Sequence, residues 1–425
     1  MCCGNALQLA KQRTTFTLPS NFLRRSGITR DSYSSDYLQS TNFDSKLYVG
    51  IHSDEWLGKM GISAFHGAAF KISGIPEVAL MGGATTPLPG VWGAIYATDR
   101  NALPSQSPEW GAAVTASGRY SDQTLCYEFS GGRRAILPLF CSGSIFGRYA
   151  SAASPPNAWG FGGPIADAAL DAAHLNAILR DLANRNFIRI QLRPNPLTAT
   201  LWAEAIPTGW ISRPRLAHVL DLSMGYEAIW KSCFRADTRT RIRRAQRAGV
   251  EVETGQDERL VDEFHALLRK SFERWAHIQR EPTALARWRG LRRDPRSKFI
   301  STAAAMGSNF RVSIARLGGV PIAAIVVLMG RQAHYTRGAM DEELAGTTYA
   351  NYLLHSMAIK DACDRGCTHY HLGETGNSAS LARFKSRFGA VAVPYAEYFR
   401  ERLPVSAIDG AARRLVKRLI GFRDG

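Results

Sequence analysis

A lysine lies on the apolar face of a short helix that the sequence predicts close to the C-terminal end of the chain. Residues 369–390, HYHLGETGNSASLARFKSRFGA, indicate a strand, a Gly/Asn/Ser turn and then this helix. Ser378 or Ser380 can cap its start, and Gly389 suits a left-handed residue after its end. Side chains at i, i+3, i+4 and i+7 share one helix face; here they are Leu381, Phe384, Lys385 and Phe388. A lysine on such a face is paired, extended toward water, or used to bind an anion.

A carboxylate follows the strand that precedes this helix. Glu374 comes directly after Leu372 and Gly373. The carboxyl end of a strand that leads into a helix is where α/β folds bind ligands. Glu374 could therefore accept a proton from a bound amine, and a solvated loop carboxylate is the alternative.

Two further polar residues alternate along an earlier strand-like segment. Tyr335 and Arg337 are separated by one residue, so they share one face of the strand. That face could line the same cleft, with Arg337 on a phosphate or carboxylate; a surface ion pair is the alternative. The backbone N–H groups of Thr347 and Thr348 open the next predicted helix and offer a second anion site.

Basic residues are concentrated in two runs, 231–247 and 287–298, and each run contains a single acid. Arg239 and Arg243 are spaced i, i+4 in the first run and could clamp one phosphate group. A solvated helix face is the alternative interpretation. Few aromatic residues interleave with either run, which argues against stacking on single-stranded nucleic acid.

Composition places the chain among globular proteins with an anionic partner. The 425 residues exceed one ordinary core and favour two domains, and the net charge of +17 favours RNA, a nucleotide, coenzyme A or a membrane surface. No apolar run is long enough to span a bilayer. Seven scattered cysteines favour a reducing, cytoplasmic location. The cluster of Cys363, Cys367, His369 and His371 matches no zinc module, so no metal site is predicted.

An internal repeat organises the chain. Residues 127–139 predict a hairpin that is followed by a helix at about 170–184 and a strand at 187–194. Residues 312–329 predict a second Gly-Gly hairpin, followed by a strand, a helix at about 347–365 and a strand at 368–373. Asp181, Arg185 and Leu192 recur as Asp361, Arg365 and Leu372 at a constant offset. Two similar α/β units are therefore expected.

Several segments carry a resemblance to a known family. The ending with Leu372-Gly373, Phe384-Lys385 and Phe388-Gly389 resembles that of Fem-type (FemAB-like) aminoacyltransferases of the acetyltransferase (GNAT) superfamily. WGFGGPIAD (159–167), IQLRPNP (190–196) and residues 218–255 resemble other segments of that family in the same order. The resemblance implies an α/β (α+β) fold of two tandem GNAT-like domains, with mixed, mostly antiparallel sheets flanked by helices. The expected parts are a flexible tail (1–45), a first domain (46–212), a second domain (213–405) and a basic amphipathic tail (406–425).

The resemblance also implies direct N-acyl transfer to an amine, with a cell-envelope precursor among the acceptors it suggests. It places Lys385 at the transfer site with Phe384 beside it, and Glu374 and Tyr335 complete the expected catalytic set. The expected substrate-binding residues are Arg337, Phe384, Arg239, Arg243, Thr347, Thr348 and Gly163. No tightly bound cofactor is expected. Acyl-coenzyme A is favoured over aminoacyl-tRNA as co-substrate because residues 249–299 show one ordinary helix (257–275) and a basic loop, not a long coiled-coil arm.

A different class of function stays open: a non-catalytic RNA- or polysaccharide-binding protein that keeps the fold. The C-terminal segment AARRLVKRLIGF is amphipathic and could lie on an anionic membrane, which would make a cytoplasmic protein membrane-peripheral. Packing against its own domain is the alternative for this segment.

Overall fold

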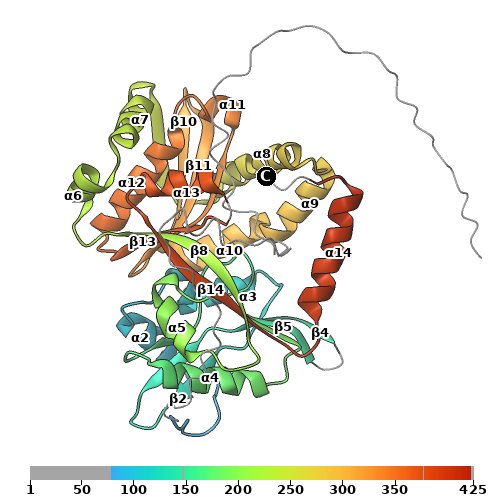
Figure 1. Cartoon of the computed structure of the whole chain (residues 1–425). Coiled ribbons are helices and arrows are strands. Elements are labelled where there is room, and N and C mark those ends of the chain that lie inside the picture. The colour runs from blue at the N-terminus through green and yellow to red at the C-terminus, as the bar shows by residue number, and fades with distance from the viewer. Residues whose placement is uncertain (1–77, 146–147, 377, 423–425) are drawn as a thin grey trace, which may run out of the picture. The chain divides into compact units, whose positions relative to one another are not determined.

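A mixed sheet runs through the part of the chain that the structure describes. The structure is a computed structural model that describes residues 78–145, 148–376 and 378–422, and the tail expected at 1–45 lies outside them. Within these residues, eleven strands form one sheet in the order β1-β4-β5-β7-β14-β8-β13-β12-β11-β10-β9, and β2-β3-β6 form a second, smaller sheet (Figure 1). The strands are β1 (Ser121–Asp122), β2 (Leu125–Glu128), β3 (Arg134–Leu137), β4 (Phe140–Ile145), β5 (Arg148–Ser154), β6 (Ile165–Ala166), β7 (Arg189–Leu192), β8 (Ile211–Asp221), β9 (Val250–Gly255), β10 (Phe310–Leu317), β11 (Val320–Leu328), β12 (Ala333–Met340), β13 (His369–Glu374) and β14 (Val391–Glu401).

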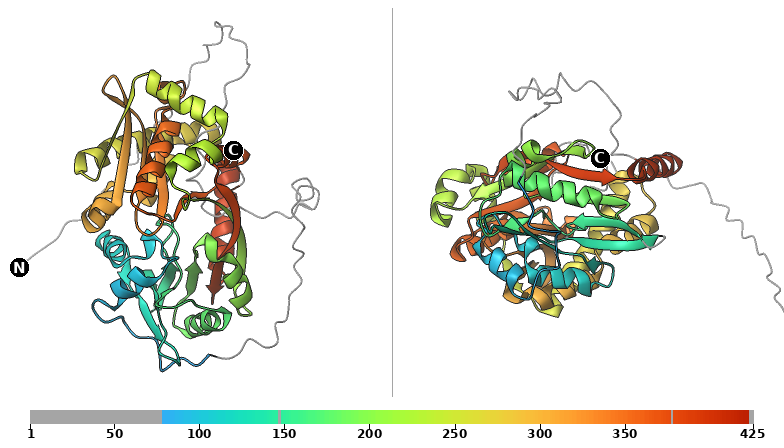
Figure 2. Two further views of the ribbon diagram at one scale, coloured as in Figure 1. Left: turned by 90° about the vertical axis from the view of Figure 1, so that its left-hand side faces the viewer. Right: turned by 90° about the horizontal axis from the view of Figure 1, so that it is seen from below.

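Helices cover the sheet and connect its strands (Figure 2). The α-helices are α2 (Val91–Thr98), α3 (Pro108–Ala116), α4 (Ala172–Asn184), α5 (Ala199–Ala205), α6 (Tyr226–Ala228), α7 (Ala236–Arg247), α8 (Glu258–Gln279), α9 (Thr283–Arg293), α10 (Arg296–Met306), α11 (Glu342–Ala345), α12 (Ala350–Asp364), α13 (Ala379–Ser386) and α14 (Val405–Leu419). One π-helical turn, η4 (Ile229–Cys233), precedes α7. The basic run at 287–298 belongs to α9 and α10, so the prediction of a loop there was wrong. Arg293 ends α9 and Pro295 precedes α10, so one run of charges spans two helix ends.

The predicted repeat is present, but its first hairpin is a different one. In the second half, β11 and β12 are antiparallel, α12 follows, and β13 returns parallel to β12. In the first half, β4 and β5 are antiparallel, α4 follows, and β7 returns parallel to β5. The predicted hairpin at 127–139 does form, with Gly131 and Gly132 at positive φ, but it belongs to the small sheet.

The repeated residues have the same structural role in both halves. Arg185 pairs with Asp181 at 2.7 Å and Arg365 pairs with Asp361 at 3.0 Å, each one helical turn apart at the end of its helix. Leu192 in β7 and Leu372 in β13 are both fully buried in the strands that follow. The constant offset in the sequence therefore reflects two copies of one helix–strand connection.

The last strand ties the two halves of the sheet together. β14 pairs antiparallel with β8 along Val391–Phe399 and with β7 along Tyr398–Glu401. β8 in turn pairs with β13. The sheet is therefore continuous from β1 to β9, and the predicted boundary at 212/213 falls within β8 and stays a prediction.

The fold class is the predicted one, a mixed and mostly antiparallel α/β arrangement flanked by helices. α14 has no buried side chain, so packing of its apolar face on its own domain is not seen in the described residues. None of the helices in this part of the chain combines the length and the apolar character needed to cross a bilayer.

Candidate active site

Two parallel strands separate and leave a pocket between them. β12 and β13 pair only at Ala333↔Tyr370 and His334↔His371. The strands on either side are also irregular. The pairing of β11 with β12 shifts register between Val326 and Val327, and the pairing of β13 with β8 shifts register between His371 and Gly373, where Gly373 has a φ of +73°. The pocket has a volume of about 80 Å³, and we call it the wedge pocket. Its lining includes Arg193, Arg293, His334, Tyr335, Arg337 and Glu374. Three of the predicted residues, Tyr335, Arg337 and Glu374, therefore meet in one pocket.

Glu374 presents its carboxylate to the wedge pocket from the end of β13. Its Oε1 accepts a hydrogen bond from the hydroxyl of Tyr395 in β14 and lies 3.8 Å from Nε of Arg193. The side chain keeps 17% of its surface exposed. Burial raises the pKa of Tyr395, with Glu374 adding to the rise, so this tyrosine stays protonated and donates to the carboxylate. The arrangement holds an ionisable oxygen at a fixed place in the pocket, which suits proton acceptance.

Lys385 lies behind the wedge pocket and not in its lining. The helix face predicted from the spacing is confirmed, since Leu381, Phe384, Lys385 and Phe388 are all buried. Lys385 is 1% exposed, and its Nζ donates to the carbonyl oxygens of Gly373 at 3.0 Å and Glu374 at 2.7 Å. Burial lowers its pKa to about 7 against the opposing effect of Glu374. The ammonium therefore fixes the strand end that carries Glu374.

Phe384 belongs to an aromatic cluster beneath the sheet. Its ring centroid lies 5.2 Å from that of Tyr352, 5.4 Å from His355 and 5.2 Å from Phe388. This packing holds α13 against α12 and so sets the position of Lys385. Ser378 caps α13 through Leu381 N, as the sequence predicted.

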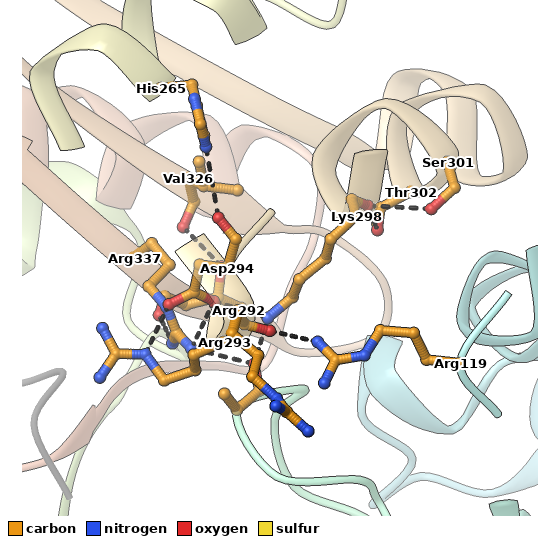
Figure 3. Close-up of polar contacts among 12 residues, drawn as sticks. Arg119, His265, Arg292, Arg293, Asp294, Lys298, Ser301, Thr302, Val326 and Arg337 are labelled. Atoms are coloured by element: carbon orange, nitrogen blue, oxygen red, sulfur yellow. Dashed lines mark hydrogen bonds and ion pairs between the residues drawn. The ribbon is translucent and has the colours of Figure 1, made fainter. Parts of the chain in front are cut away.

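Arg337 is bound to a buried carboxylate. Its Nε donates to Oδ2 of Asp294 at 3.0 Å, and its Nη2 lies 2.9 Å from Oδ1 (Figure 3). Asp294 is 0% exposed and also pairs with Arg293 at 2.7 Å and Lys298 at 2.8 Å. Although burial opposes ionisation, these three cations hold the pKa of Asp294 well below its ordinary range. Asp294 therefore balances the charge of Arg337 inside the protein. From the sequence we expected a bound phosphate or carboxylate, or a surface ion pair, in this role.

The Asp294 cluster also holds the loop that covers the wedge pocket. Nη2 of Arg337 donates to the carbonyl oxygen of Ala158 at 3.0 Å, and Nζ of Lys298 donates to the same oxygen at 2.6 Å. Ala158 has a positive φ of 67°, and its loop contributes part of the pocket lining. Since Arg293 and Arg337 both line the pocket and share one carboxylate, this side of the pocket keeps a net positive charge that favours an anionic group or a developing oxyanion.

Tyr335 and a histidine that the sequence analysis did not single out form the floor of the pocket. The Tyr335 ring packs edge-on against His355 at 4.6 Å. His334 stacks on Phe161 at 4.9 Å, and burial, with help from Arg337 and Lys385, lowers its pKa to about 3. His334 is therefore a neutral imidazole, and its Nδ1 has no hydrogen-bond partner among the described residues.

The other predicted substrate-binding residues lie away from the wedge pocket. Nη1 of Arg239 donates to the carbonyl oxygens of Trp230, Lys231 and Phe234, and so caps η4. Arg243 is exposed and stacks on the Trp230 ring at 5.8 Å. These two arginines therefore meet at Trp230, and a shared phosphate stays a prediction.

The remaining predicted residues, Thr347, Thr348 and Gly163, lie in backbone turns. α12 begins at Ala350, after Tyr349 in a left-handed conformation, so Thr347 and Thr348 lie in the preceding turn. The Thr348 hydroxyl donates to Ala345 O and accepts from Ala350 N. Gly163 has φ +87°, and an added Cβ would lie 3.0 Å from the Trp202 ring. It serves a tight turn and lies outside the wedge pocket.

Sequence reasoning missed Arg193, Tyr395, Asp294 and His334. Arg193 lies inside the segment IQLRPNP that carried the family resemblance, and Asp294 is the single acid of the second basic run. The position of Asp294 as a single acid among six basic residues is the signal in the sequence that could have predicted its buried ion pairs. Tyr395 carries no local signal, because it reaches Glu374 from a strand 21 residues later.

Comparisons with known proteins agree with this architecture. Residues 232–386 match the family model described as acetyltransferase (GNAT) domain. The crystal structure of FemX superposes with a TM-score of 0.56 at 12% identity, covering 74% of this chain and 96% of FemX. A conserved protein of unknown function from Bacteroides thetaiotaomicron VPI-5482 superposes with a TM-score of 0.47 at 12% identity, over 74% of this chain and 98% of that one. No curated protein sequence matches the chain.

The family match covers α7 through α13, the segment that contains the wedge pocket's strands and the Lys385 helix. The likeness to FemX extends over the first half as well and shows the fold. Residues 232–386 therefore form a GNAT-superfamily acetyltransferase domain, which confirms the predicted enzyme class, and the likeness to FemX confirms the predicted fold.

Proposed function

We propose that the protein transfers an acyl group from acyl-coenzyme A to the amine of an acceptor, with the reaction in the wedge pocket. The observation that carries this proposal is the separation of β12 from β13 beyond His334 and His371, with Arg337 of β12 and Glu374 of β13 lining the pocket between them. Two parallel strands that stop pairing expose backbone groups to a ligand between them. No covalent enzyme intermediate is needed for such a transfer.

Glu374 acts as the proton acceptor in this proposal. The acceptor amine attacks the thioester carbonyl carbon, the C–N bond forms, and the C–S bond then breaks to release the coenzyme A thiolate. Glu374 takes the amine proton, while Tyr395 and Arg193 hold its carboxylate in place. The positive wall around Arg337 stabilises the oxyanion that develops on the carbonyl oxygen. Lys385 acts as a positioning residue through the backbone of Glu374.

The phosphates of the donor meet the start of α12 in this proposal. Arg241 and Arg244 from α7 lie over the Tyr349 ring at 5.4 and 5.3 Å, beside Thr347 and Thr348. A helix N-terminus and two guanidinium groups together favour an anion. We expect Arg244→Gln to raise the KM for acetyl-coenzyme A about tenfold with kcat unchanged, and Arg247→Gln, exposed on the same helix, to leave both values unchanged.

Release of free coenzyme A thiol from acetyl-coenzyme A, in the presence of a panel of amines, tests the reaction. Wild-type protein should show amine-dependent release, Glu374→Gln should lose it, and the exposed Glu343→Gln should retain it. Acetyl-coenzyme A binding without turnover would favour the non-catalytic alternative. Transfer from aminoacyl-tRNA but not from any acyl-coenzyme A would replace the proposed donor, and a cell-envelope precursor belongs in the acceptor panel.

The C-terminal helix supports a membrane-peripheral location. α14 exposes Ile408, Leu415 and Leu419 at 64%, 60% and 77%. Four cations, Arg413, Arg414, Lys417 and Arg418, accompany them, against one acid, Asp409. Exposed leucines flanked by cations fit an anionic lipid surface. We infer that α14 lies on such a surface.

Sedimentation with vesicles tests this inference. The protein should sediment with phosphatidylglycerol vesicles and remain in the supernatant with phosphatidylcholine vesicles. Replacing Leu415 and Leu419 by Ser should abolish sedimentation, whereas Val320→Ser, which removes an exposed apolar side chain elsewhere, should not. Sedimentation that survives loss of both leucines would refute the role of α14.

A further inference from the structure

A second pocket lies on one face of the first half's sheet. Alternate residues of β4, β5, β7, β14 and β8 point to this face, since side chains alternate along a strand. They include Arg189 of β7, Arg193 directly after β7, Arg213 and Arg215 of β8, and Glu397 and Phe399 of β14. The pocket has a volume of about 270 Å³, and we call it the arginine pocket. Asn157 and Arg193 line both this pocket and the wedge pocket, so the two are neighbours.

Glu397 is the carboxylate at the centre of the arginine pocket, and its oxygens are already occupied. Its Oε1 accepts from Nη2 of Arg193 at 2.8 Å and from Gln191, and its Oε2 accepts from Nη2 of Arg215 at 2.6 Å. Its side chain is 1% exposed. Although burial opposes ionisation, Arg193 and Arg215 lower the pKa of Glu397 to about 2. Glu397 is therefore a fixed anion that balances its two arginine neighbours.

Arg213 is left without a carboxylate of its own. It faces Glu397 directly across the β8–β14 ladder, yet that carboxylate is bound to the arginines on either side. Its guanidinium lies over the Phe399 ring at 4.2 Å, and no described residue forms an ion pair or side-chain hydrogen bond with it. Arg189, which lies over the same ring at 5.0 Å, pairs with Glu401 at 3.2 Å. Burial lowers the pKa of Arg213, Arg189 and Arg215 add to the decrease, and Glu397 and Glu401 oppose it, so the nearby carboxylates offset the burial of this cation only in part.

The C-terminal helix contributes to the same pocket. Asp409 and Arg413 of α14 line it and pair with each other at 2.9 Å. They lie about a third of a turn around the helix from the exposed leucines. The pocket therefore holds five arginines, and the carboxylates around it leave one guanidinium, that of Arg213, unmatched among the described residues.

We propose that the arginine pocket binds an oxyanion, a carboxylate or a phosphate, carried by the acyl acceptor. Arg213 supplies the unmatched charge from a position over the Phe399 ring, and a guanidinium group suits a two-point hydrogen bond to such an oxyanion. Arg193, which lies between Glu397 and Glu374, joins this pocket to the proton acceptor. The assignment of this oxyanion to the acyl acceptor rests on the proposed function. It implies that the acceptor is an amine that also carries a carboxylate or phosphate group.

Calorimetric titration with inorganic phosphate, and separately with acetate, at constant ionic strength tests the pocket in the full chain. Wild-type protein should bind a single phosphate saturably, and acetate should compete if a carboxylate also fits. Arg213→Gln should weaken phosphate binding about tenfold or more. Arg213→Lys keeps the positive charge and loses the two-point hydrogen bond of the guanidinium, so its phosphate affinity should lie between those of wild type and Arg213→Gln. This variant also serves as a control for a folding defect in Arg213→Gln. Arg247→Gln, exposed on α7 and outside the pocket, is the matched control.

Equal weakening by Arg247→Gln would mean a diffuse effect of net charge and would overturn the proposal, as would phosphate binding that Arg213→Gln leaves unchanged. The titration repeated with saturating acetyl-coenzyme A separates the two proposals. Phosphate affinity should stay the same; competition by acetyl-coenzyme A would assign the pocket to the donor and overturn the acceptor assignment. If acetyl-coenzyme A fails to bind while phosphate binds through Arg213, the proposed donor fails and the oxyanion pocket remains.

Discussion

The ammonium of Lys385 donates a hydrogen bond of 2.7 Å to the backbone carbonyl oxygen of Glu374. A second bond, of 3.0 Å, goes to the carbonyl oxygen of the preceding Gly373. The lysine from one helix thus determines the course of the strand end whose side chain enters the wedge pocket. In the proposed function its role is to position Glu374, without contact between the lysine and the substrate.

Lys385→Met should lower kcat about a hundredfold while leaving the protein folded. The methionine keeps the volume and apolar character of the stem but releases the two carbonyl groups, so Glu374 loses its fixed position. The KM for acetyl-coenzyme A should change little, because the start of α12 is untouched. Steady-state kinetics of wild type and Lys385→Met check this; full turnover in the variant would show that the lysine's hydrogen bonds have no part in catalysis.

The stability of the same variant should depend on pH in a defined direction. Burial lowers the pKa of Lys385 from its ordinary 10.5 to about 7, so between these values the unfolded chain binds more protons than the folded one. The free energy of unfolding contributed by this group therefore rises with pH across that window. Lys385→Met should match or exceed wild type in stability at pH 7, and its advantage should shrink toward pH 10. Urea unfolding at several pH values measures the difference in free energy of unfolding between Lys385→Met and wild type, and the contributions of other titrating groups cancel in this difference. A stability advantage of the variant that grows with pH would contradict this prediction.

Glu374→Gln should lower kcat by about a hundredfold or more, which is the scale of lost general-base catalysis. Folding should be preserved, because the amide oxygen can still accept from the Tyr395 hydroxyl. Tyr395→Phe, which removes that donor and keeps the carboxylate, should show a smaller loss. A Tyr395→Phe variant that is as impaired as Glu374→Gln would indicate that Tyr395, and not Glu374, handles the proton.

Asp294→Asn should destabilise the protein by about 3–5 kcal/mol, since Arg337 and Arg293 would keep their charges without a buried anion. The matched control is Asp364→Asn, which breaks an exposed pair with Lys360 and should cost less than about 1 kcal/mol. Because the pKa of Asp294 is lowered in the folded state, its contribution is present above the unfolded pKa and is lost as the pH falls below it. Chemical denaturation of both variants at pH 7 and at about pH 2.5 measures these effects, because only the second pH lies below the unfolded pKa; equal costs for the two variants at pH 7 would refute the role of the cluster.

Arg239 and Arg243 should differ in their effect on stability. Arg239→Gln removes the donor that caps three carbonyl groups at the end of η4, and should cost about 1–2 kcal/mol. Arg243→Gln removes an exposed stacking contact and should change stability by less than about 0.5 kcal/mol. Thermal unfolding of the two single variants distinguishes them. If only Arg243→Gln weakens binding of a phosphate ligand, the predicted clamp reduces to a single arginine.

Local patterns predicted the elements whose residues are close together in the sequence. The face of α13, the cap at Ser378 and the Gly-Gly hairpin before β11 depend on spacing within one turn or one hairpin, and all three are present. β4 and β5 were missed because small and polar residues such as those in FCSGSI and RYASAAS give no clear alternation. The first repeat was consequently aligned on the neighbouring hairpin, which has the stronger turn signal in Gly131 and Gly132.

Long-range pairings of charge could not be derived in the same way. Arg337 was expected on a ligand or in a surface pair, but its partner Asp294 lies 43 residues earlier and is fully buried. Arg239 appeared free because the carbonyl groups that bind it carry no signal in the side-chain sequence. The pairing of strands in the folded sheet decides which cations lack an ion-pair partner. The sequence does not give the register of β8 and β14, so it could not show that Glu397 faces Arg213.

The insertion of β14 between β7 and β8 has a consequence for the order in which the chain folds during synthesis. Residues 391–401 supply the strand that completes the first half's sheet, yet they leave the ribosome after every residue of the second half's strands. Until then β7 exposes an unpaired edge, and the arginines of β7 and β8 lack Glu397. A nascent chain that has emerged only to about residue 390 should therefore be protease-sensitive in its first half, and protection should appear once β14 has emerged.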